Sequence, residues 1–201
     1  MNGTDTTLEA IFEEHAAVAV ASRAQLLPGI AELAAQVMAA LDAGGKLLVF
    51  GNGGSAADAQ HFAAELVGRF SRARRGLPAV ALTTDSSVLT AIANDFSYDD
   101  VFARQVEALC GSRDIAIGIS TSGTAESVAR GLAAARRRGA RTWALTGAAG
   151  GRVAEAAEFE LRVPSAVTAR VQEMHILIIH AVSELVDAQA AESKGPIHGP
   201  G

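Results

Sequence analysis

Two ionisable side chains, His61 and Glu65, stand four residues apart shortly after the glycine-rich stretch GNGGS (51–55). In a helix this spacing places both side chains on one face. An imidazole and a carboxylate so arranged can bind a metal ion or transfer a proton, but such a pair is more often an ordinary surface or half-buried contact. Taken alone, the pair leaves both interpretations open.

A second polar pair lies in the apolar segment RVQEMHILIIH (170–180), where Gln172 and His180 are eight residues apart. Two turns of helix return them to nearly the same face, and polar groups in an apolar helix need partners. Together with His61 and Glu65 they offer two imidazoles, a carboxylate and an amide oxygen, which is a possible tetrahedral zinc set with one unusual ligand. Spacing alone does not show that the two segments meet.

Hydroxyl groups gather around Gly123 in GISTSGTAES (118–127), directly before a helix-periodic segment, on Ser120, Thr121, Ser122 and Thr124. Hydroxyls and free backbone N–H groups at a helix N-terminus suit an anion. The alternative is an ordinary capped helix with Ser122 or Thr124 as N-cap. A second turn of similar character, formed by Asn52, Gly53, Gly54 and Ser55, favours a ligand site.

The type of ligand follows from what these loops lack. No lysine follows the glycines of either loop, so neither is a P-loop, and neither matches G-x-G-x-x-G. A small phosphorylated molecule is therefore a better candidate than a nucleotide.

The other histidines and the arginine clusters suggest less. His175 falls on a different helix face from Gln172 and His180, and we expect a core or interface histidine. His15 and His198 have no polar company in the pattern and are expected to be structural or solvated. The arginines at 72–75 and 136–138 are expected to form solvated helix or loop surfaces, and the second group also suits a helix C-terminus.

The elements that position these residues are predicted by short apolar runs at 47–50, 79–82, 115–119, 142–146 and 158–163. Helix-periodic segments follow most of them, which indicates an α/β fold with a parallel sheet covered on both faces. In such sheets the loops at the carboxyl ends of the strands form the ligand crevice. Both glycine- and hydroxyl-rich loops fall at that edge.

The two ends of the chain differ from this pattern. Residues 1–44 read as two helices, with Pro28 at the start of the second and Gly44-Gly45 at its end. The segment 166–190 reads as a long helix, and residues 191–201 as a flexible tail rich in glycine and proline. We therefore expect an N-terminal helical segment (1–44), one α/β domain (45–190) and the tail.

Composition excludes several classes of protein. The 201 residues suit one domain, and an apolar fraction of 49% is enough for a core. A net charge of −5 gives no general attraction to nucleic acid or to anionic membranes. The start of the chain has no secretory signal pattern, no apolar run approaches the ~18 residues of a membrane span, and a single cysteine, Cys110, cannot form an internal disulfide. We expect a soluble protein of a reducing cytoplasm.

Five segments closely resemble phosphoheptose isomerases of the sugar-isomerase (SIS) superfamily: GNGGSAADAQHFAAEL, LTTDSSVLTAIANDF, VFARQVEAL, GISTSG and ARVQEMHILIIH. The resemblance runs from about residue 5 to residue 187. It implies a flavodoxin-like three-layer αβα domain preceded by N-terminal helices and assembled as a homotetramer. It also implies interconversion of D-sedoheptulose 7-phosphate and D-glycero-D-manno-heptose 7-phosphate, on the route to nucleotide-activated heptose.

The resemblance also implies roles for individual residues. Zinc, one ion per subunit, would be held by His61, Glu65, Gln172 and His180, and Glu65 and His180 would be the acid/base pair. The substrate would contact the loop at 52–55, Glu65, Asn94, Asp95, Ser120, Thr121, Ser122 and Gln172. The family usually continues STSG with Asn-Ser, whereas this chain has Thr124 and Ala125, so Thr124 is the candidate for the missing hydroxyl.

Two other functions remain open from the sequence. Some closely related SIS proteins bind the bacterial replication initiator instead of catalysing a reaction, but the intact set of His61, Glu65, Gln172 and His180 argues against this reading. An isomerase of another phosphosugar is the third possibility.

Overall fold

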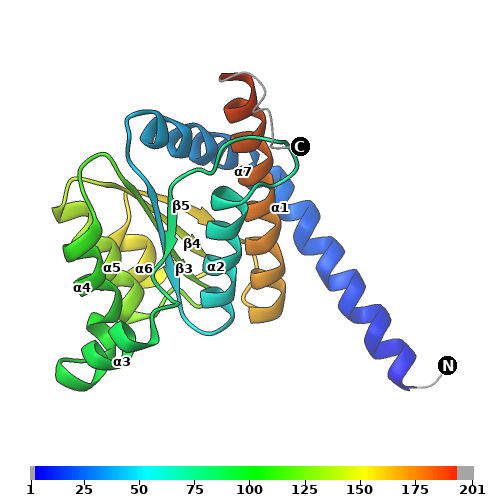
Figure 1. Ribbon diagram of the computed structural model, residues 1–201. Helices are drawn as coiled ribbons and strands as arrows, with labels where there is room; N and C mark the ends of the chain where they lie inside the picture. Colours follow the sequence, from blue (N-terminus) through cyan, green and yellow to red (C-terminus); the bar gives the residue numbers. More distant parts are fainter. Residues whose placement is uncertain (1–2, 194–201) are drawn as a thin grey trace.

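The strands form one parallel sheet in the order β2-β1-β3-β4-β5. The computed structural model describes residues 3–193 (Figure 1). The strands are β1 (Leu47–Gly51), β2 (Ala79–Ala81), β3 (Ile115–Ser120), β4 (Arg141–Thr146) and β5 (Phe159–Arg162). Every apolar run predicted as a strand is one, which confirms the α/β prediction.

Alternation along the strands divides the core between the two faces of the sheet. Leu47 and Val49 of β1 pack on one side, whereas Leu48 and Phe50 pack on the other, and all four are buried. A strand apolar on both faces suits the interior of a parallel sheet covered by helices.

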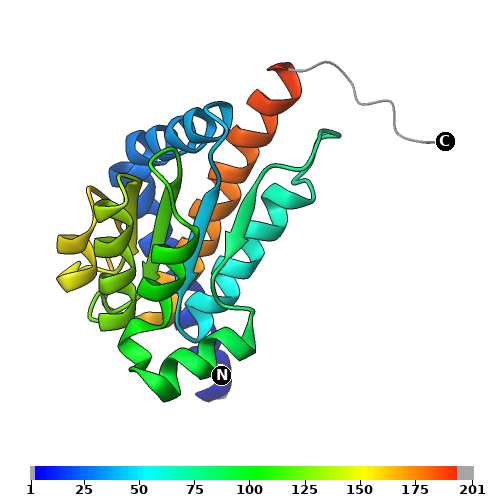
Figure 2. The same ribbon diagram turned by 60° about the vertical axis from the view of Figure 1, so that its left-hand side comes forward.

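The helices cover both faces of the sheet (Figure 2). On one face lie α1 (Gly3–Asp42), α2 (Gly54–Val67) and α7 (Thr168–Ser193). On the other lie α3 (Ser86–Asp95), α4 (Val101–Leu109), α5 (Glu126–Arg137) and α6 (Gly151–Ala156), with the short 3-10 helix η1 (Tyr98–Asp100) before α4. This is the expected three-layer arrangement.

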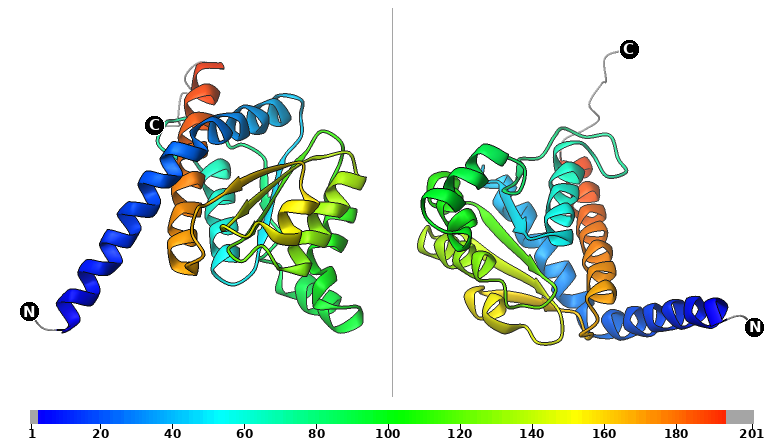
Figure 3. Two further views of the ribbon diagram at one scale, coloured as in Figure 1. Left: turned by 180° about the vertical axis from the view of Figure 1, so that it is seen from behind. Right: turned by 90° about the horizontal axis from the view of Figure 1, so that it is seen from below.

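The N-terminal segment is one helix and not the two predicted. Pro28 lies inside α1, which changes direction part-way along its length (Figure 3). A proline inside a helix removes one backbone bond and bends the axis. The prediction failed because tertiary packing holds the second half of the helix, where Leu33, Val37 and Leu41 are buried in the core.

The C-terminal helix continues beyond its predicted end at 190, to Ser193. The remainder of the predicted tail, with His198, lies outside the described residues. The boundaries of the three predicted segments stay a prediction.

α1 is long and apolar enough, by length and composition only, to span a membrane. Within the described residues it alone passes that test, and 39% of the relevant window is buried inside the protein. Its buried side chains belong to the same core as those of α2 and α7. A core helix of this kind passes the test without any membrane, so the observation is weak.

α2 and α7 begin at the same edge of the sheet and run side by side (Figures 1 and 2). α2 follows the carboxyl end of β1 and α7 follows that of β5, so the two helices are parallel. Residues far apart in the sequence therefore meet in register along the pair.

His175 attaches α7 to the sheet from inside the core. Its side chain is fully buried, and its Nε2 lies 3.2 Å from the Thr146 carbonyl oxygen at the end of β4. Its Nδ1 has no hydrogen-bond partner among the described residues. Burial disfavours the charged ring and lowers the pKa of His175 from 6.5 to about 4, against a smaller opposing effect of the Thr146 bond. The prediction of a core histidine is confirmed.

This buried ring predicts a pH dependence of stability. The unfolded chain binds a proton at His175 near pH 6.5, whereas the folded chain does so only near pH 4. The free energy of unfolding should therefore fall as the pH drops from about 6.5 to 4, by up to about 3 kcal/mol from this group, and no further below. Urea unfolding across this range should show a shallower slope for His175→Gln than for the wild type. Equal slopes for His175→Gln and wild type would contradict the assignment.

Candidate active site

The two predicted ligand loops flank the point where the sheet changes winding direction. The chain leaves β1 into α2 on one face and leaves β3 into α5 on the other. In the order 2-1-3-4-5 the crevice between β1 and β3 is the usual ligand position. Asn52 bridges it, because its Nδ2 donates to the Ser127 Oγ of α5 (2.9 Å) and its Oδ1 accepts from the Tyr98 hydroxyl (2.9 Å).

Glycine is required in these loops by backbone geometry. Gly53 has φ +56° and precedes the first residue of α2. Gly123 has φ +71°, and a Cβ there would lie 2.1 Å from the Gly150 carbonyl oxygen. Side chains are therefore kept away from the crevice, and the backbone is free to approach a ligand.

The hydroxyl loop is not an ordinary helix cap. The N-cap of α5 is Ala125, which makes no side-chain capping bond, so the alternative with Ser122 or Thr124 as N-cap is wrong. The exposed hydroxyls of these two residues face each other at 2.8 Å. Hydroxyls and an N-terminus without a side-chain cap favour an anionic ligand here.

A carboxylate in the first turn of α5 would repel such an anion, but its charge is compensated. Glu126 pairs with Arg130 (2.8 Å) and with Arg152 (2.5 Å). These bonds lower the pKa of Glu126, which stays ionised. Arg130 also bonds Asp100 of η1 at 2.9 Å and so ties α5 to the segment that carries Tyr98.

The predicted histidine and glutamate side chains converge between α2 and α7. The Nε2 atoms of His61 and His180 are 2.8 Å apart, and the Glu65 Oε1 lies 3.3 Å from the His61 Nε2. One donor atom from each of the three residues lies within 4.8 Å of the others. Ligands about 2 Å from one ion are themselves roughly 3 to 3.5 Å apart, so this His61–Glu65–His180 cluster fits a transition metal.

Gln172 lies elsewhere along the same helix pair. Its amide hydrogen-bonds Asp58 and packs on the loop, since a Cβ added at Gly54 would meet its Nε2 at 2.3 Å. Eight residues separate Gln172 from His180, about 12 Å along α7. Gln172 therefore lies against the loop after β1, and its predicted role as a fourth metal ligand stays a prediction.

Asp58 sits between these two groups. It is 5% exposed, and its Oδ2 has no partner among the residues that the structure describes. Burial raises the pKa of Asp58, while the bond from Gln172 and the nearby His61 act in the opposite direction. Asn94 and Asp95, at the end of α3, are exposed and joined by a 2.8 Å bond from the Asn94 amide.

Comparisons with known proteins identify the family of the chain. The SIS domain family model matches residues 12–147. The phosphoheptose isomerase of Aquifex aeolicus is 53% identical over 182 residues, covering 90% of this chain and 95% of that protein. That of Geobacter metallireducens is 55% identical over 176 residues, covering 88% and 93%. The chain belongs to the phosphoheptose isomerase family.

Solved structures of the family superpose closely on the fold. The phosphoheptose isomerase of Neisseria gonorrhoeae has a TM-score of 0.87 at 42% identity, over 92% of this chain and 99% of that chain. The phosphoheptose isomerase of Francisella tularensis has a TM-score of 0.89 at 37% identity, over 94% and 100%. The SIS family model ends at residue 147, before α7 begins. The similarity to phosphoheptose isomerases covers nearly the whole length of those proteins and therefore extends into α7.

Sequence reasoning missed several side chains of the site. Asp58 precedes His61 by three residues, so helical spacing placed it on the same face and offered a usable signal. Tyr98 and Phe70 gave none, because an isolated aromatic residue in a loop has no distinguishing pattern. The ring of Phe70 lies 5.6 Å from that of His180.

Two expectations about charged residues were wrong. Arg74, assigned to a solvated cluster, has a side chain only 2% exposed that pairs with the buried Asp187. His15, expected to lack polar company, has its Nδ1 2.7 Å from the Glu173 carboxylate. In both cases the partner lies on α7, more than a hundred residues away in the sequence.

The cluster predicts metal binding that depends on His180. His180→Asn removes one of three donor atoms. Substitutions of residues that only support a ligand weaken metal binding by roughly 10- to 100-fold, so loss of the ligand itself should weaken the binding of a divalent transition metal by more than that. His15→Asn is the matched control, since it removes a hydrogen-bonded histidine outside the cluster. Calorimetric titration of both variants with the metal alone checks this. Equal affinity of His180→Asn and wild type would show that the cluster is not the binding site.

Proposed function

We propose that the protein is an aldose–ketose isomerase that converts D-sedoheptulose 7-phosphate to D-glycero-D-manno-heptose 7-phosphate, the first step towards nucleotide-activated heptose. The activity is that for which its relatives are named, at 53% identity over 90% of the chain. The observation that carries the proposal is the convergence of His61, Glu65 and His180 from two helices. A non-catalytic relative would have no need of this arrangement.

The phosphate end of the sugar is assigned to the loop after β3. Ser120, Thr121 and Ser122 would donate hydroxyl and backbone N–H groups to the phosphate oxygens. Thr124, 2.8 Å from Ser122, would supply the hydroxyl that Ala125 lacks. Binding energy at this end holds the distant reacting carbons in place.

The loop after β1 and the end of α3 would hold the sugar chain. Asn52 is fixed by Ser127 and Tyr98, so its amide is oriented before a ligand arrives. Gly53 and Gly54 leave the backbone accessible beside Ser55, and Gln172 lies against Gly54. Asn94 and Asp95 are exposed polar groups suited to sugar hydroxyls.

Glu65 is proposed as the base that moves the proton between C1 and C2. Its carboxylate has two oxygens, so one can face the cluster while the other faces the substrate. A group positioned in this way typically accelerates proton transfer by about 10²- to 10⁴-fold.

We propose zinc as the metal, one ion per chain, held by His61, Glu65 and His180. Two imidazoles and a carboxylate are a common catalytic zinc set that leaves one position free. When bound, zinc would polarise the substrate carbonyl and stabilise the charge that develops on the enediol oxygens. His180 would act chiefly as a ligand, since its Nε2 points at His61. Gln172, which the resemblance also implies as a zinc ligand, would complete the donor set.

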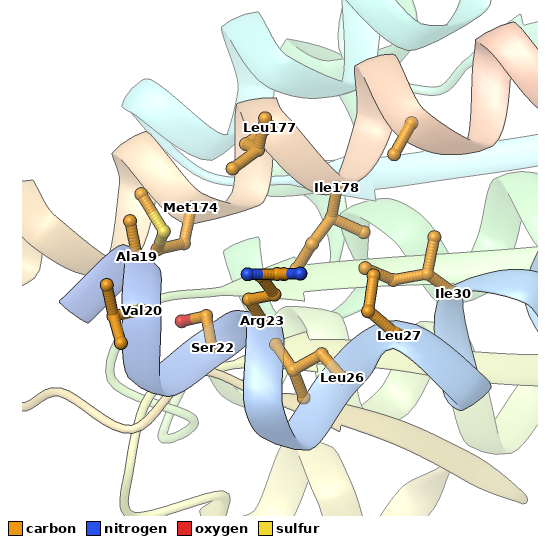
Figure 4. Close-up of a pocket in the computed structure, with 11 residues that line it drawn as sticks. Ala19, Val20, Ser22, Arg23, Leu26, Leu27, Ile30, Met174, Leu177 and Ile178 are labelled. Atoms are coloured by element: carbon orange, nitrogen blue, oxygen red, sulfur yellow. The ribbon is translucent and has the colours of Figure 1, made fainter. Parts of the chain in front are cut away.

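Assembly as a homotetramer is proposed from the apolar surface that a single chain leaves exposed. The first half of α1 projects from the body of the protein (Figures 1 and 3). Phe12 is 73% and Val20 72% exposed. Between α1 and α7 lies an apolar groove, with Leu26, Leu27 and Ile30 on one side and Met174, Leu177 and Ile178 on the other (Figure 4). Apolar surface of this extent indicates an interface.

The active sites are proposed to lie near the subunit boundaries. Glu65 lies eleven residues after Gly54, about 16 Å along α2 from the edge that carries the loops. His180 of the cluster also follows Leu177 and Ile178, two residues that line the apolar groove, on the same helix α7. A cytoplasmic location is also proposed, in keeping with the single free cysteine, Cys110.

Replacement of Glu65 tests the proposed chemistry. Glu65→Gln keeps the shape of the side chain and one oxygen but removes the base, so turnover of sedoheptulose 7-phosphate should fall by about 10²- to 10⁴-fold. Substrate affinity should change much less, because both loops stay intact. The direct measurement is exchange of the C1 or C2 proton with deuterated solvent. Exchange at the wild-type rate in this variant would mean that Glu65 is not the base.

A matched control distinguishes this loss from a general effect of removing charge. Glu107→Gln changes a surface glutamate that pairs loosely with Arg137 at 3.6 Å, and it should leave turnover unchanged. If the wild type itself turns over another phosphosugar and not sedoheptulose 7-phosphate, the substrate assignment is wrong although the chemistry stands.

Assembly is tested at the groove. Leu27 is 55% exposed, so Leu27→Glu should leave the fold of one chain intact while introducing a charge into each copy of the interface. Each leucine side chain lost from an interface costs roughly 1.5–3 kcal/mol, and symmetry repeats the loss. Sedimentation should show smaller species for this variant only. Leu109→Glu, at a 48% exposed position on α4, is the control. A wild type that is monomeric and active contradicts the proposal.

A further inference from the structure

The loop that follows α2 is fastened to α7 by one buried carboxylate. Asp187 is fully buried, and it accepts the backbone N–H groups of Ser71 (3.0 Å) and Arg72 (2.6 Å), with a longer contact from Phe70 (3.5 Å). Its Oδ1 also accepts from the Arg74 Nε at 2.6 Å. Burial alone would raise the pKa of Asp187, but these N–H donors and the Arg74 charge lower it, so the group is ionised.

Arg74 carries the connection on to α2. Its guanidinium donates to the backbone carbonyl oxygens of Glu65 (2.8 Å) and Leu66 (2.8 Å), and to Gly68 at 3.4 Å. The last carbonyl groups of a helix lack intrahelical partners, and a cation there is favoured by the helix dipole. Arg74 therefore binds the turn of α2 that carries Glu65.

The same connection reaches the other side of the cluster. Asp187 follows His180 by seven residues, two turns further along α7 and on nearly the same face. The loop held by Asp187 also places the Phe70 ring against the His180 ring, with centroids 5.6 Å apart. One ion pair thus links the turn bearing Glu65, the helix bearing His180 and the ring that packs on that imidazole.

Such a pair fixes the relative positions of its partners more than it adds to the free energy of unfolding. Removing two opposite charges from water costs about as much as their attraction returns, so a buried ion pair is a poor stabiliser compared with apolar packing. A fully satisfied network, by contrast, has few alternative arrangements. Here most of the partners are backbone groups of α2 and of the loop after it, and α7 contributes the Asp187 carboxylate.

We propose that Arg74 and Asp187 are positioning residues for the metal cluster. They set the separation of α2 and α7 at the level of Glu65 and His180, and they hold Phe70 against His180. This inference rests on the proposed function, in that His61, Glu65 and His180 are taken as the metal ligands.

The probe is Co²⁺ alone, titrated into the full-length metal-free protein and followed by its visible absorption, which reports ligand geometry. Asp187→Asn keeps the shape but removes the charge. Arg74→Lys keeps a cation beside Asp187 but loses the fork that reaches the Glu65 and Leu66 carbonyl groups. Both should weaken Co²⁺ binding by about 10- to 100-fold, the usual cost of disturbing groups behind the ligands, and both should alter the spectrum.

The chain offers a matched control in a buried carboxylate whose partners lie outside α2 and α7. Asp114 is 5% exposed, pairs with the Lys46 Nζ at 2.7 Å and accepts the N–H groups of Lys46 and Gly111. Asp114→Asn removes an equivalent buried charge next to the amino ends of β1 and β3. It should lower the melting temperature without changing Co²⁺ affinity or spectrum.

The outcomes separate the two proposals. If the wild type does not bind Co²⁺ at the cluster, the proposed metal site fails. If the wild type binds and both Asp187→Asn and Arg74→Lys bind equally well with the same spectrum, losing only thermal stability as Asp114→Asn does, the positioning role is wrong. Should Asp187→Asn not fold, Arg74→Lys decides by itself, because it retains a charge against Asp187.

Discussion

The active-site geometry depends on the parallel packing of α2 against α7. Both helices start at the carboxyl edge of the sheet, so equal distances along them bring distant residues together. Gln172 meets Gly54 and Asp58 at the first level, His180 meets His61 at the second, and Asp187 meets the loop after α2 at the third. Spacings of seven or eight residues on α7 repeat this contact, because that is two turns of helix. If the helices shifted by one turn, every one of these contacts would be lost together.

The sheet imposes the second constraint. Because β1 and β3 send their helices to opposite faces, a crevice opens between their carboxyl ends, and both ligand loops border it. A side-chain hydrogen bond from Asn52 to Ser127 spans this crevice. Glu126 is the acidic residue in the first turn of α5, and Arg130 and Arg152 pair with it. These two arginines neutralise its charge beside the proposed phosphate loop. The proposed substrate loops thus lie at strand ends, whereas the residues proposed for proton transfer and metal binding lie on a helix pair.

Part of the exposed apolar surface lies near the metal cluster along the chain, on α7. The loops and the cluster lie at different positions along α2, and His180 of the cluster follows the groove residues Leu177 and Ile178 on α7. The proposed assembly through the groove would bring a second chain close to this part of α7. Exclusion of water strengthens every electrostatic interaction within such a site.

Local pattern determined much of this protein. Apolar runs of four to six residues identified all five strands, because a strand in a covered parallel sheet is apolar on both faces. Glycines and hydroxyls after two of the runs located the crevice, and the spacing of His61, Glu65 and His180 gave residue types able to bind a metal. Tertiary structure decided the rest. Pro28 continues a helix since the core holds the part of the helix after the bend, Arg74 is buried since Asp187 lies opposite, and Gln172 contacts the loop residue Gly54 since α2 and α7 pack side by side. In each case the partner lies far away in the chain, and local periodicity carries no information about which two faces will pack together.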